Sequence, residues 1–262
     1  MGFFAKWRIN KQVTTHGKVE VSEQRGVRTL HLGSDTVQSV MRVNDPYALE
    51  ASYTRAMMAF LLFQPAPREI LQVGLGGGST AKWIHHHLPE ARDHIVEIHP
   101  EVIATARSYF HLPPDDARLQ VEVGEGAAFV QAHPEAADVL LVDGYDVDRQ
   151  AASLGTQEFY DACRRTLKPG GVFVANLWGT DTSYPIFVDR ISAAFDGLFL
   201  LLPADGKHNI IALGFERTQN EPKWEDLRAR ARELEARFGL EFLHFVQSLK
   251  RLNVHTERRL LV

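Results

Sequence analysis

The sequence predicts an α/β protein: a doubly wound, mostly parallel sheet preceded by a small antiparallel β-domain. Three observations carry this prediction. Strand-like and helix-like apolar patterns alternate from residue 66 onward, which is typical of a parallel sheet covered on both faces. A glycine-rich turn joins the first of these strands to its helix. Before residue 44, short runs alternate between apolar and polar residues, as half-buried antiparallel strands do.

The N-terminal part reads as a small antiparallel sheet. We expect residues 1–12 to form a loose arm and residues 13–43 to form the sheet. Residues 18–23 and 27–32 alternate around the turn at Arg25-Gly26 and predict a β-hairpin, and 37–41 predicts a third strand. A helix is expected over 49–62 and should end at the prolines that follow it. We therefore divide the chain into a β-domain with its linker helix, 1–65, and a nucleoside-binding catalytic domain, 66–262.

The second domain is expected to contain seven strands with helices between them. The expected strands are 69–73, 94–98, 119–123, 137–143, 172–177, 198–202 and 209–215. The expected helices are 79–88, 100–109, 126–132, 156–166, 184–195 and 224–238, with a tail helix over 240–262. Apolar residues of this tail could dock on the body of the protein or on a partner chain: Leu243, Phe245, Val246 and Leu249.

The turn after the first strand reads GLGGGS, and it indicates a ligand site of the Rossmann type. Glycine accepts positive φ and lets a ligand approach the backbone, and the helix that follows offers unpaired N–H groups. The alternative interpretation is a tight turn alone. We assign the turn to binding of a nucleoside-type ligand through Gly74, Gly76, Gly77 and Gly78.

Acidic residues follow the next strands, at the edge where ligands of open parallel sheets bind. Glu97 lies at the tip of the second strand, about 20 residues after the glycine turn, the spacing of a carboxylate that binds a ribose diol. Glu125 and Gly126 follow the third strand and are expected near the adenine. The alternative for Glu125 is a helix cap.

Asp143 ends the fourth, apolar strand, and Asp146 follows in the loop. Two carboxylates there could hold a cationic amine and accept its proton while the amine attacks a sulfonium. The alternative is a turn with solvated acids. Because Asp148 adds a third acid to this loop, a metal is conceivable, but no His or Cys ligand pattern accompanies the acids, and we expect none. His85-His86-His87 does not converge on one ion either, because neighbouring helical residues point in different directions.

Composition narrows the class of protein. Of the 262 residues, 45% are hydrophobic and 24% are charged, as in soluble globular proteins. The net charge of −4 argues against a nucleic-acid partner. Cys163 is the sole cysteine, so an internal disulfide is excluded and a reducing cytoplasm fits. No apolar run reaches the ~18 residues of a membrane span, and we read no signal peptide, so no membrane partner is expected.

From about residue 29 to residue 215 the chain resembles the spermidine synthase (polyamine aminopropyltransferase) family. The resemblance rests on five segments in the family's order: ILQVGLGGGST, IVEIHPEVIATARSYF, RLQVEVGEGAAFV, DVLLVDGYD and EFYDACRRTLKPGGVFVANLW. It implies a class I methyltransferase-type fold and transfer of an aminopropyl group from decarboxylated S-adenosylmethionine, a co-substrate rather than a tightly bound cofactor, to a diamine. It also implies a homodimer and a role in polyamine biosynthesis.

The resemblance also implies residue roles. Glu97 matches the ribose-binding acid, and Glu125 stands where the family has an adenine-contacting Asp. Asp143 matches the Asp that deprotonates the amine, and Asp146 matches a second amine-binding Asp. Further matches are Gln38, a cofactor-site glutamine after the small sheet, and Tyr53, a substrate-site tyrosine.

Several positions depart from the family pattern. Gly77 replaces an Asp that contacts the aminopropyl amine, His99 replaces an acid, and Thr54-Arg55 replaces two polar site residues. The nucleoside half therefore matches better than the amine half. Two alternatives stay open: an S-adenosylmethionine-dependent methyltransferase, and a degenerate homologue that binds methylthioadenosine without turnover. Arg55 in the pocket would fit an anionic acceptor better than a polyamine.

Overall fold

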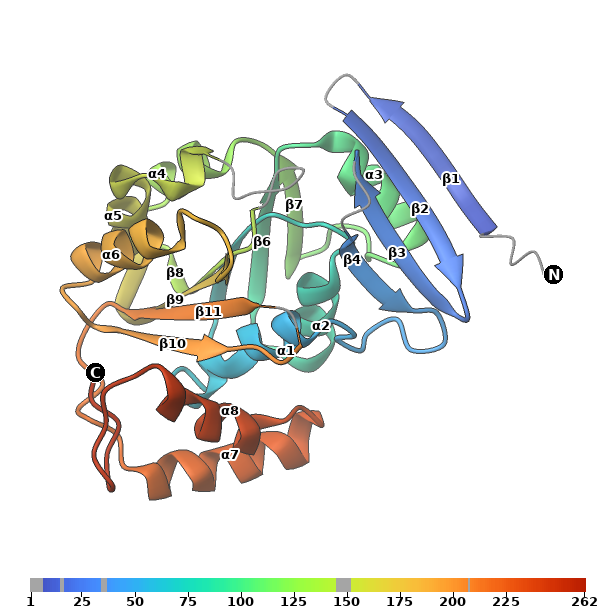
Figure 1. Cartoon of the computed structure of the whole chain (residues 1–262). Coiled ribbons are helices and arrows are strands. Elements are labelled where there is room, and N and C mark those ends of the chain that lie inside the picture. The colour runs from blue at the N-terminus through green and yellow to red at the C-terminus, as the bar shows by residue number, and fades with distance from the viewer. Residues whose placement is uncertain (1–6, 15–16, 34–36, 145–151, 207) are drawn as a thin grey trace.

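The computed structural model describes residues 7–14, 17–33, 37–144, 152–206 and 208–262. Its N-terminal part is an antiparallel sheet with the strand order β1-β2-β3-β4 (Figure 1). The strands are β1 (Trp7–Thr14), β2 (Gly17–Gln24), β3 (Val27–Leu32) and β4 (Val37–Arg42). The predicted small sheet is confirmed, but the loose arm was wrong where it covered 7–12. Strand β1 has only three apolar residues, Trp7, Ile9 and Val13, and it pairs with β2 along its backbone.

The small sheet is fixed to the rest of the protein by its apolar face. Val21, Leu30 and Met41 are fully buried and pack with Val102 and Phe110, which lie in and directly after α3 (Pro100–Tyr109). Side chains alternate between the two faces of a strand, and these three residues share the same face of the small sheet. The contact holds β4 against the edge of the large sheet, where the ligand site was predicted.

The large sheet has the strand order β10-β11-β9-β8-β5-β6-β7 in the part of the chain that is described. Its strands are β5 (Glu69–Val73), β6 (Arg92–Glu97), β7 (Leu119–Val123), β8 (Ala137–Val142), β9 (Leu167–Trp178), β10 (Phe199–Pro203) and β11 (Asn209–Phe215). Strands β5 to β9 pair in parallel, as predicted, whereas β11 is antiparallel to both β9 and β10. The doubly wound sheet is thus confirmed, with one reversed strand near an end.

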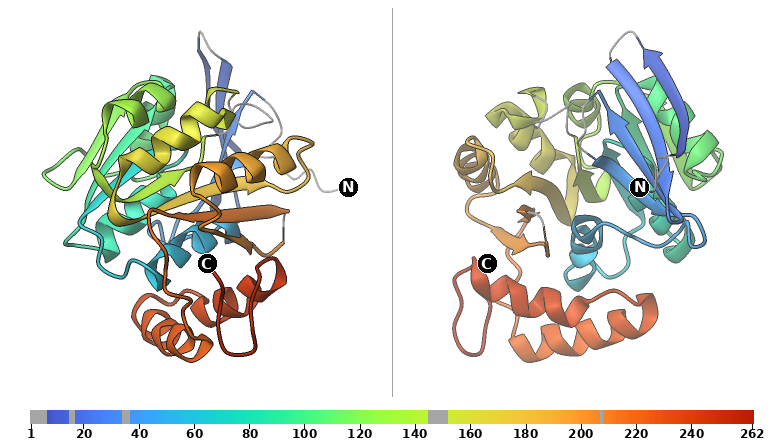
Figure 2. Two further views of the ribbon diagram at one scale, coloured as in Figure 1. Left: turned by 90° about the vertical axis from the view of Figure 1, so that its left-hand side faces the viewer. Right: turned by 45° about the vertical axis from the view of Figure 1, so that its right-hand side comes forward.

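Helices cover both faces of this sheet (Figures 1 and 2). One face packs against α1 (Ser52–Met57), the 3₁₀ helix η1 (Met58–Leu62), α2 (Ser79–His87), α7 (Trp224–Phe238) and α8 (Phe242–Ser248). The other face packs against α4 (Gly126–Ala132), α5 (Gln157–Thr166) and α6 (Tyr184–Ala194). Two short 3₁₀ helices are η2 (Ala152–Gly155), before α5, and η3 (Leu249–Arg251), after α8. The small sheet and the α7–α8 pair lie at opposite ends of the molecule.

Two expected helices differ from the structure. The helix over 49–62 is a short α-helix followed by a 3₁₀ helix, and residues 58–62 are completely buried, so their continuous apolar run carries no period. The tail helix over 240–262 ends early, because α8 and η3 reach only Arg251. Phe245, Val246 and Leu249 are buried against the body of the protein, while Leu243 is 37% exposed.

Within the described ranges, no helix combines the length and the apolar character needed to cross a membrane. Cys163 is buried in α5, and burial raises the pKa of its thiol well above the usual value. This fits the prediction of a small buried hydrophobe rather than a nucleophile.

Candidate active site

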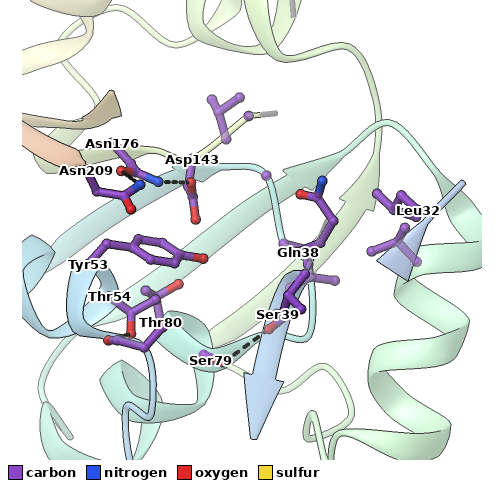
Figure 3. Close-up of a pocket in the computed structure, with 18 of the residues that line it drawn as sticks. Leu32, Gln38, Ser39, Tyr53, Thr54, Ser79, Thr80, Asp143, Asn176 and Asn209 are labelled. Atoms are coloured by element: carbon purple, nitrogen blue, oxygen red, sulfur yellow. Dashed lines mark hydrogen bonds between the residues drawn. The ribbon is translucent and has the colours of Figure 1, made fainter. Parts of the chain in front are cut away.

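A cavity of about 1130 Å³ lies at the edge of the large sheet where the parallel strands end. Strand β4 of the small sheet and helix α1 close it from the other side (Figure 3). The cavity brings together most of the residues predicted from the sequence: Gln38, Tyr53, Gly74, Gly76, Glu97, Glu125, Gly126 and Asp143. Asp146 lies outside the described residues, so its role in amine binding stays a prediction.

The glycine turn adopts the backbone conformations that favour glycine. Gly74, Gly76 and Gly78 have φ values of 92°, 54° and 69°. A Cβ atom at Gly74 would lie 2.3 Å from the backbone oxygen of Asp143, so only glycine fits between the ends of β5 and β8. The turn and the proposed base are therefore in direct backbone contact.

Gly77 and Gly78 belong to the turn but are not among the residues that line the cavity. A Cβ at Gly77 would lie 2.7 Å from Oγ of Ser39 and 2.8 Å from Cδ1 of Phe110, and one at Gly78 would meet Leu112. These two glycines permit close packing of β4 and of the segment after α3. Their part in ligand binding stays a prediction.

Glu97 is 8% exposed and lies beneath the cavity at the end of β6. Its two carboxylate oxygens accept backbone hydrogen bonds of 3.0 Å, one from Leu75 N–H in the glycine turn and one from His99 N–H. Each oxygen keeps a second lone pair. The carboxylate can therefore hold the turn and still accept hydrogen bonds from two ribose hydroxyls.

Glu125 caps helix α4, which was the alternative considered from the sequence. Its Oε2 accepts a 2.8 Å hydrogen bond from Ala128 N–H, and its Oε1 accepts one of 2.8 Å from the hydroxyl of Ser153. Burial disfavours its charge, but these hydrogen bonds outweigh burial and lower the pKa of Glu125. Because the residue also lines the cavity, capping and adenine binding are compatible.

Asp143 faces the cavity directly after β8 and is partly buried. Burial raises the pKa of Asp143, while hydrogen bonds from Asn176 and Tyr53 oppose that rise. Its backbone N–H donates to Val73 O at 2.9 Å, which ties it to the strand before the glycine turn. A carboxylate with a raised pKa in a cavity can serve as a general base.

Arg55 lines the cavity, but its charge is already engaged. Its Nε donates to Glu241 at 2.7 Å, and its Nη1 donates to the backbone oxygens of Leu49 and Glu50. The expectation that Arg55 would favour an anionic acceptor is therefore not supported by the geometry. Tyr53, one residue from the start of the same helix, instead turns toward Asp143 (Figure 3).

Two asparagines that the sequence analysis missed complete the surroundings of Asp143. Asn176 in β9 donates from Nδ2 to Oδ1 of Asp143 at 2.9 Å, and Asn209 in β11 donates to Oδ1 of Asn176 at 2.9 Å (Figure 3). A signal existed in the sequence, because each is a polar residue in an otherwise apolar strand. What could not be read from the sequence is that the two strands are neighbours.

The three consecutive histidines contact different neighbours, although the rings of His86 and His87 also meet edge to face. His85 pairs with Asp116 at 2.9 Å, His86 stacks on Tyr47, and His87 stacks on Trp83. His85 lies apart from the other two, so the three side chains do not converge on one point, as helix geometry predicts. Among the described residues, no group of three potential ligands is placed to hold a metal ion.

The fold and the site together define a class of protein. A parallel sheet with a reversed strand beside its fifth strand, a glycine turn and an acid on the second strand are features of Rossmann-like nucleoside-binding proteins of the class I methyltransferase type. The cavity adds a partly buried carboxylate that could accept a proton. The site is therefore that of a group-transferring enzyme with a nucleoside donor.

The chain belongs to the spermine/spermidine synthase family. Residues 50–180 match the model of the spermine/spermidine synthase domain. The chain is 43% identical over 255 residues to the polyamine aminopropyltransferase of Chromobacterium violaceum, covering 97% of this chain and 98% of the relative. It is 40% identical over 237 residues to that of Neisseria meningitidis serogroup A, covering 90% of each.

Solved structures support the fold. A probable spermidine synthase from Corynebacterium glutamicum superposes with a TM-score of 0.74 at 19% identity, covering 92% of this chain and 94% of the other. A spermidine synthase in complex with the transition-state analogue AdoDATO gives 0.72 at 22% identity, with coverage of 92% and 84%. Human methyltransferase-like protein 13 in complex with SAH gives 0.65 at 25% identity, with coverage of 72% and 93%.

Proposed function

We propose that the protein is a polyamine aminopropyltransferase of the spermidine synthase type. It takes decarboxylated S-adenosylmethionine as donor and transfers the aminopropyl group to an amine such as putrescine, giving a longer polyamine and methylthioadenosine. Family membership supports the reaction type. The single observation that carries the residue assignment is the partly buried carboxylate of Asp143, which faces the cavity beside the glycine turn.

The donor half of the site consists of backbone and carboxylate groups. Glu97 is proposed to bind the ribose hydroxyls, and Glu125 and Gly126 to lie at the adenine. Glu97 is also hydrogen-bonded to the glycine turn, so the ribose acceptor and the turn form one rigid unit. A preorganised donor site lowers the entropic cost of binding.

The chemical step needs a neutral amine and a base. The nitrogen lone pair attacks the aminopropyl carbon next to the sulfonium, the C–N bond forms as the C–S bond breaks, and the electron pair stays on sulfur. The product nitrogen is then a secondary ammonium, and we propose that Asp143 accepts its proton. Burial makes this carboxylate a stronger base, and its negative charge stabilises the cationic reactants.

A second candidate is transfer from intact S-adenosylmethionine, as in a methyltransferase. The observation in its favour is Gly77, where the resemblance implies an acid that would repel the carboxylate of that donor. A side chain at this position would also collide with Ser39 and Phe110 in the present arrangement. Donor choice is therefore the first property to measure.

The test is a titration of the purified protein with three ligands: decarboxylated S-adenosylmethionine, S-adenosylmethionine and methylthioadenosine. Putrescine is then added, and spermidine is quantified by chromatography. Preference for the decarboxylated donor together with spermidine formation supports the proposal. Preference for the carboxylated donor supports a methyltransferase. Binding of methylthioadenosine without turnover of either donor supports a degenerate homologue.

The role of Asp143 is tested by Asp143→Asn, which keeps the shape and removes the base. We expect kcat to fall by about 10²- to 10⁴-fold, the usual contribution of a general base, while donor affinity changes little. An unchanged kcat would refute the assignment.

We also propose, from the family resemblance, that the protein acts as a homodimer in the cytoplasm. The single, buried cysteine fits a reducing compartment. Sedimentation velocity at micromolar concentration tests the assembly, and a monomer of 29.5 kDa would contradict it.

A further inference from the structure

Two asparagines from neighbouring strands form a hydrogen-bonded chain that ends on Asp143. Asn209 Nδ2 donates to Asn176 Oδ1, and Asn176 Nδ2 donates to Asp143 Oδ1, each at 2.9 Å. Asn176 is 3% exposed and Asn209 is 8% exposed. Two buried amides in apolar strands are costly unless they are paired, so their arrangement calls for a physical reason.

Chemistry fixes the orientation of both amides. A charged carboxylate only accepts hydrogen bonds, so the nitrogen of Asn176 must face Asp143. The oxygen of Asn176 then faces Asn209, and Asn209 donates a hydrogen bond to it from Nδ2. If Asn176 rotated by 180°, its oxygen would face the carboxylate and its nitrogen would face another nitrogen. Asn209 therefore locks Asn176 as a hydrogen-bond donor.

We propose that Asn209 and Asn176 are positioning residues that hold the carboxylate of Asp143 in the charged state in which it accepts the proton. This inference deepens the proposed aminopropyl transfer and rests on it for its catalytic consequence. A proton on Oδ1 would meet the N–H of Asn176, a donor that cannot turn away while Asn209 holds it. The same lock stabilises the charged form, which is the form that acts as a base.

The other groups around the cavity are one further hydrogen-bonding partner of Asp143 and several charged side chains. Tyr53 from α1 also hydrogen-bonds the carboxylate. Among the described residues, the further ionisable side chains that line the cavity are Glu50, Arg55, Glu97, His99, Glu125, Asp205 and His208. Most of their charges have partners elsewhere: Glu50 with Arg42, Arg55 with Glu241, and Asp205 with His244. Glu97 and Glu125 accept hydrogen bonds from backbone N–H groups.

The pKa of Asp143 is the first readout, because it needs no substrate. Aspartate is labelled with ¹³C at the carboxyl carbon, and the signal missing in Asp143→Asn identifies the residue. Asn176→Leu removes the donor and keeps the branched shape of the side chain. Loss of a hydrogen bond to the charged form raises a pKa, so we expect a rise of about one pH unit. Asn209→Leu frees Asn176 to rotate and should raise the pKa of Asp143 by about half as much.

The second readout is the pH dependence of kcat. Since the base acts when deprotonated, kcat rises with pH through its pKa, and this limb should move to higher pH in both variants. At a pH below the limb, a shift of one unit lowers kcat about tenfold. The KM for the donor should stay within about twofold, because the nucleoside half is untouched.

A matched control separates positioning from stability. Thr166→Val removes hydrogen bonds from a buried hydroxyl to Val130 O and Ala162 O, far along the chain from Asp143. It should lower the melting temperature without moving the pKa of Asp143. If Asn176→Leu does not fold, Asn209→Leu carries the test.

The inference is overturned if a folded variant titrates at the wild-type pH, whatever its stability. It is also overturned if Asn176→Leu shifts the pKa and Asn209→Leu does not, because the lock would then be absent. If the wild-type protein forms no spermidine, the proposed function fails, but the NMR titration still decides whether the asparagines control Asp143.

Discussion

Substituting Gly74 by alanine should damage both stability and catalysis, through contact between two backbones. The added Cβ would lie 2.3 Å from the carbonyl oxygen of Asp143 and 2.9 Å from its carbonyl carbon. Ordinary contact begins near 3.4 Å, so the ends of β5 and β8 would have to separate by about 1 Å. A flexible side chain could rotate away, but the Asp143 peptide is held by its hydrogen bond to Val73.

The cost has two parts. Alanine at a φ of 92° costs about 1–2 kcal/mol in backbone strain. Forcing the two strand ends apart adds about 1–3 kcal/mol, as overpacking in cores does. The sum of about 2–5 kcal/mol is a large fraction of the stability of an ordinary domain. Since Asp143 moves with its backbone, we also expect kcat to fall by about 100-fold.

Gly197→Ala is the matched control, because Gly197 has a φ of 76° and no atom within 4 Å of the added Cβ. It carries the backbone strain without the collision. Urea unfolding followed by circular dichroism gives both free energies, and spermidine formation gives both rates. We expect Gly74→Ala to lose about 2 kcal/mol more than Gly197→Ala. Equal losses, or a Gly74→Ala enzyme with wild-type kcat, would refute the reasoning.

Two further predictions concern buried acids. Glu97→Gln places an amide nitrogen against Leu75 N–H or His99 N–H, so we expect the free energy of unfolding to fall by about 1–3 kcal/mol. We also expect methylthioadenosine to bind at least tenfold more weakly in calorimetry, and an undiminished affinity would contradict the ribose role of Glu97. Burial raises the pKa of Asp93 to about 8, with the Gln72 hydrogen bond opposing. The unfolded chain thus binds fewer protons between pH 4 and 8, and the free energy of unfolding falls as pH rises through that range. The free energy of unfolding is measured by urea unfolding at pH 5 and at pH 8. Its decrease between these two pH values should be smaller in Asp93→Asn than in the wild type by at least about 2 kcal/mol. An equal decrease in both proteins would contradict the prediction.

The strands of the large sheet were predictable because a strand buried on both faces is a continuous run of apolar residues in the sequence. The strands over 69–73, 119–123 and 209–215 were assigned the bounds that the structure has. The glycine turn, Glu97 and Asp143 were predictable for a related reason. Their positions follow directly from strand ends, and the ends of parallel strands meet at one edge of the sheet.

Elements without such a pattern were assigned wrongly. The segment 7–14 forms β1 through backbone pairing, which any sequence without proline can supply. Residues 58–62 are buried on all sides and are all apolar. Because no polar residue marks an exposed face, the sequence of this run shows no period that would distinguish a 3₁₀ helix from an α-helix. Arg55 could be assigned to the cavity from its place in the chain, but its partner Glu241 lies 186 residues away.

The sequence by itself determined the class of fold, the strand-end acids and the turn that would hold a nucleoside, because these depend on short-range patterns. The tertiary structure alone decided how Asp143 is held. Strand β11 runs antiparallel beside β9, which brings Asn209 to Asn176 and Asn176 to the carboxylate. Strand neighbours are chosen by packing over the whole sheet, and hydrogen bonds between residues 33 positions apart leave no mark in the local pattern.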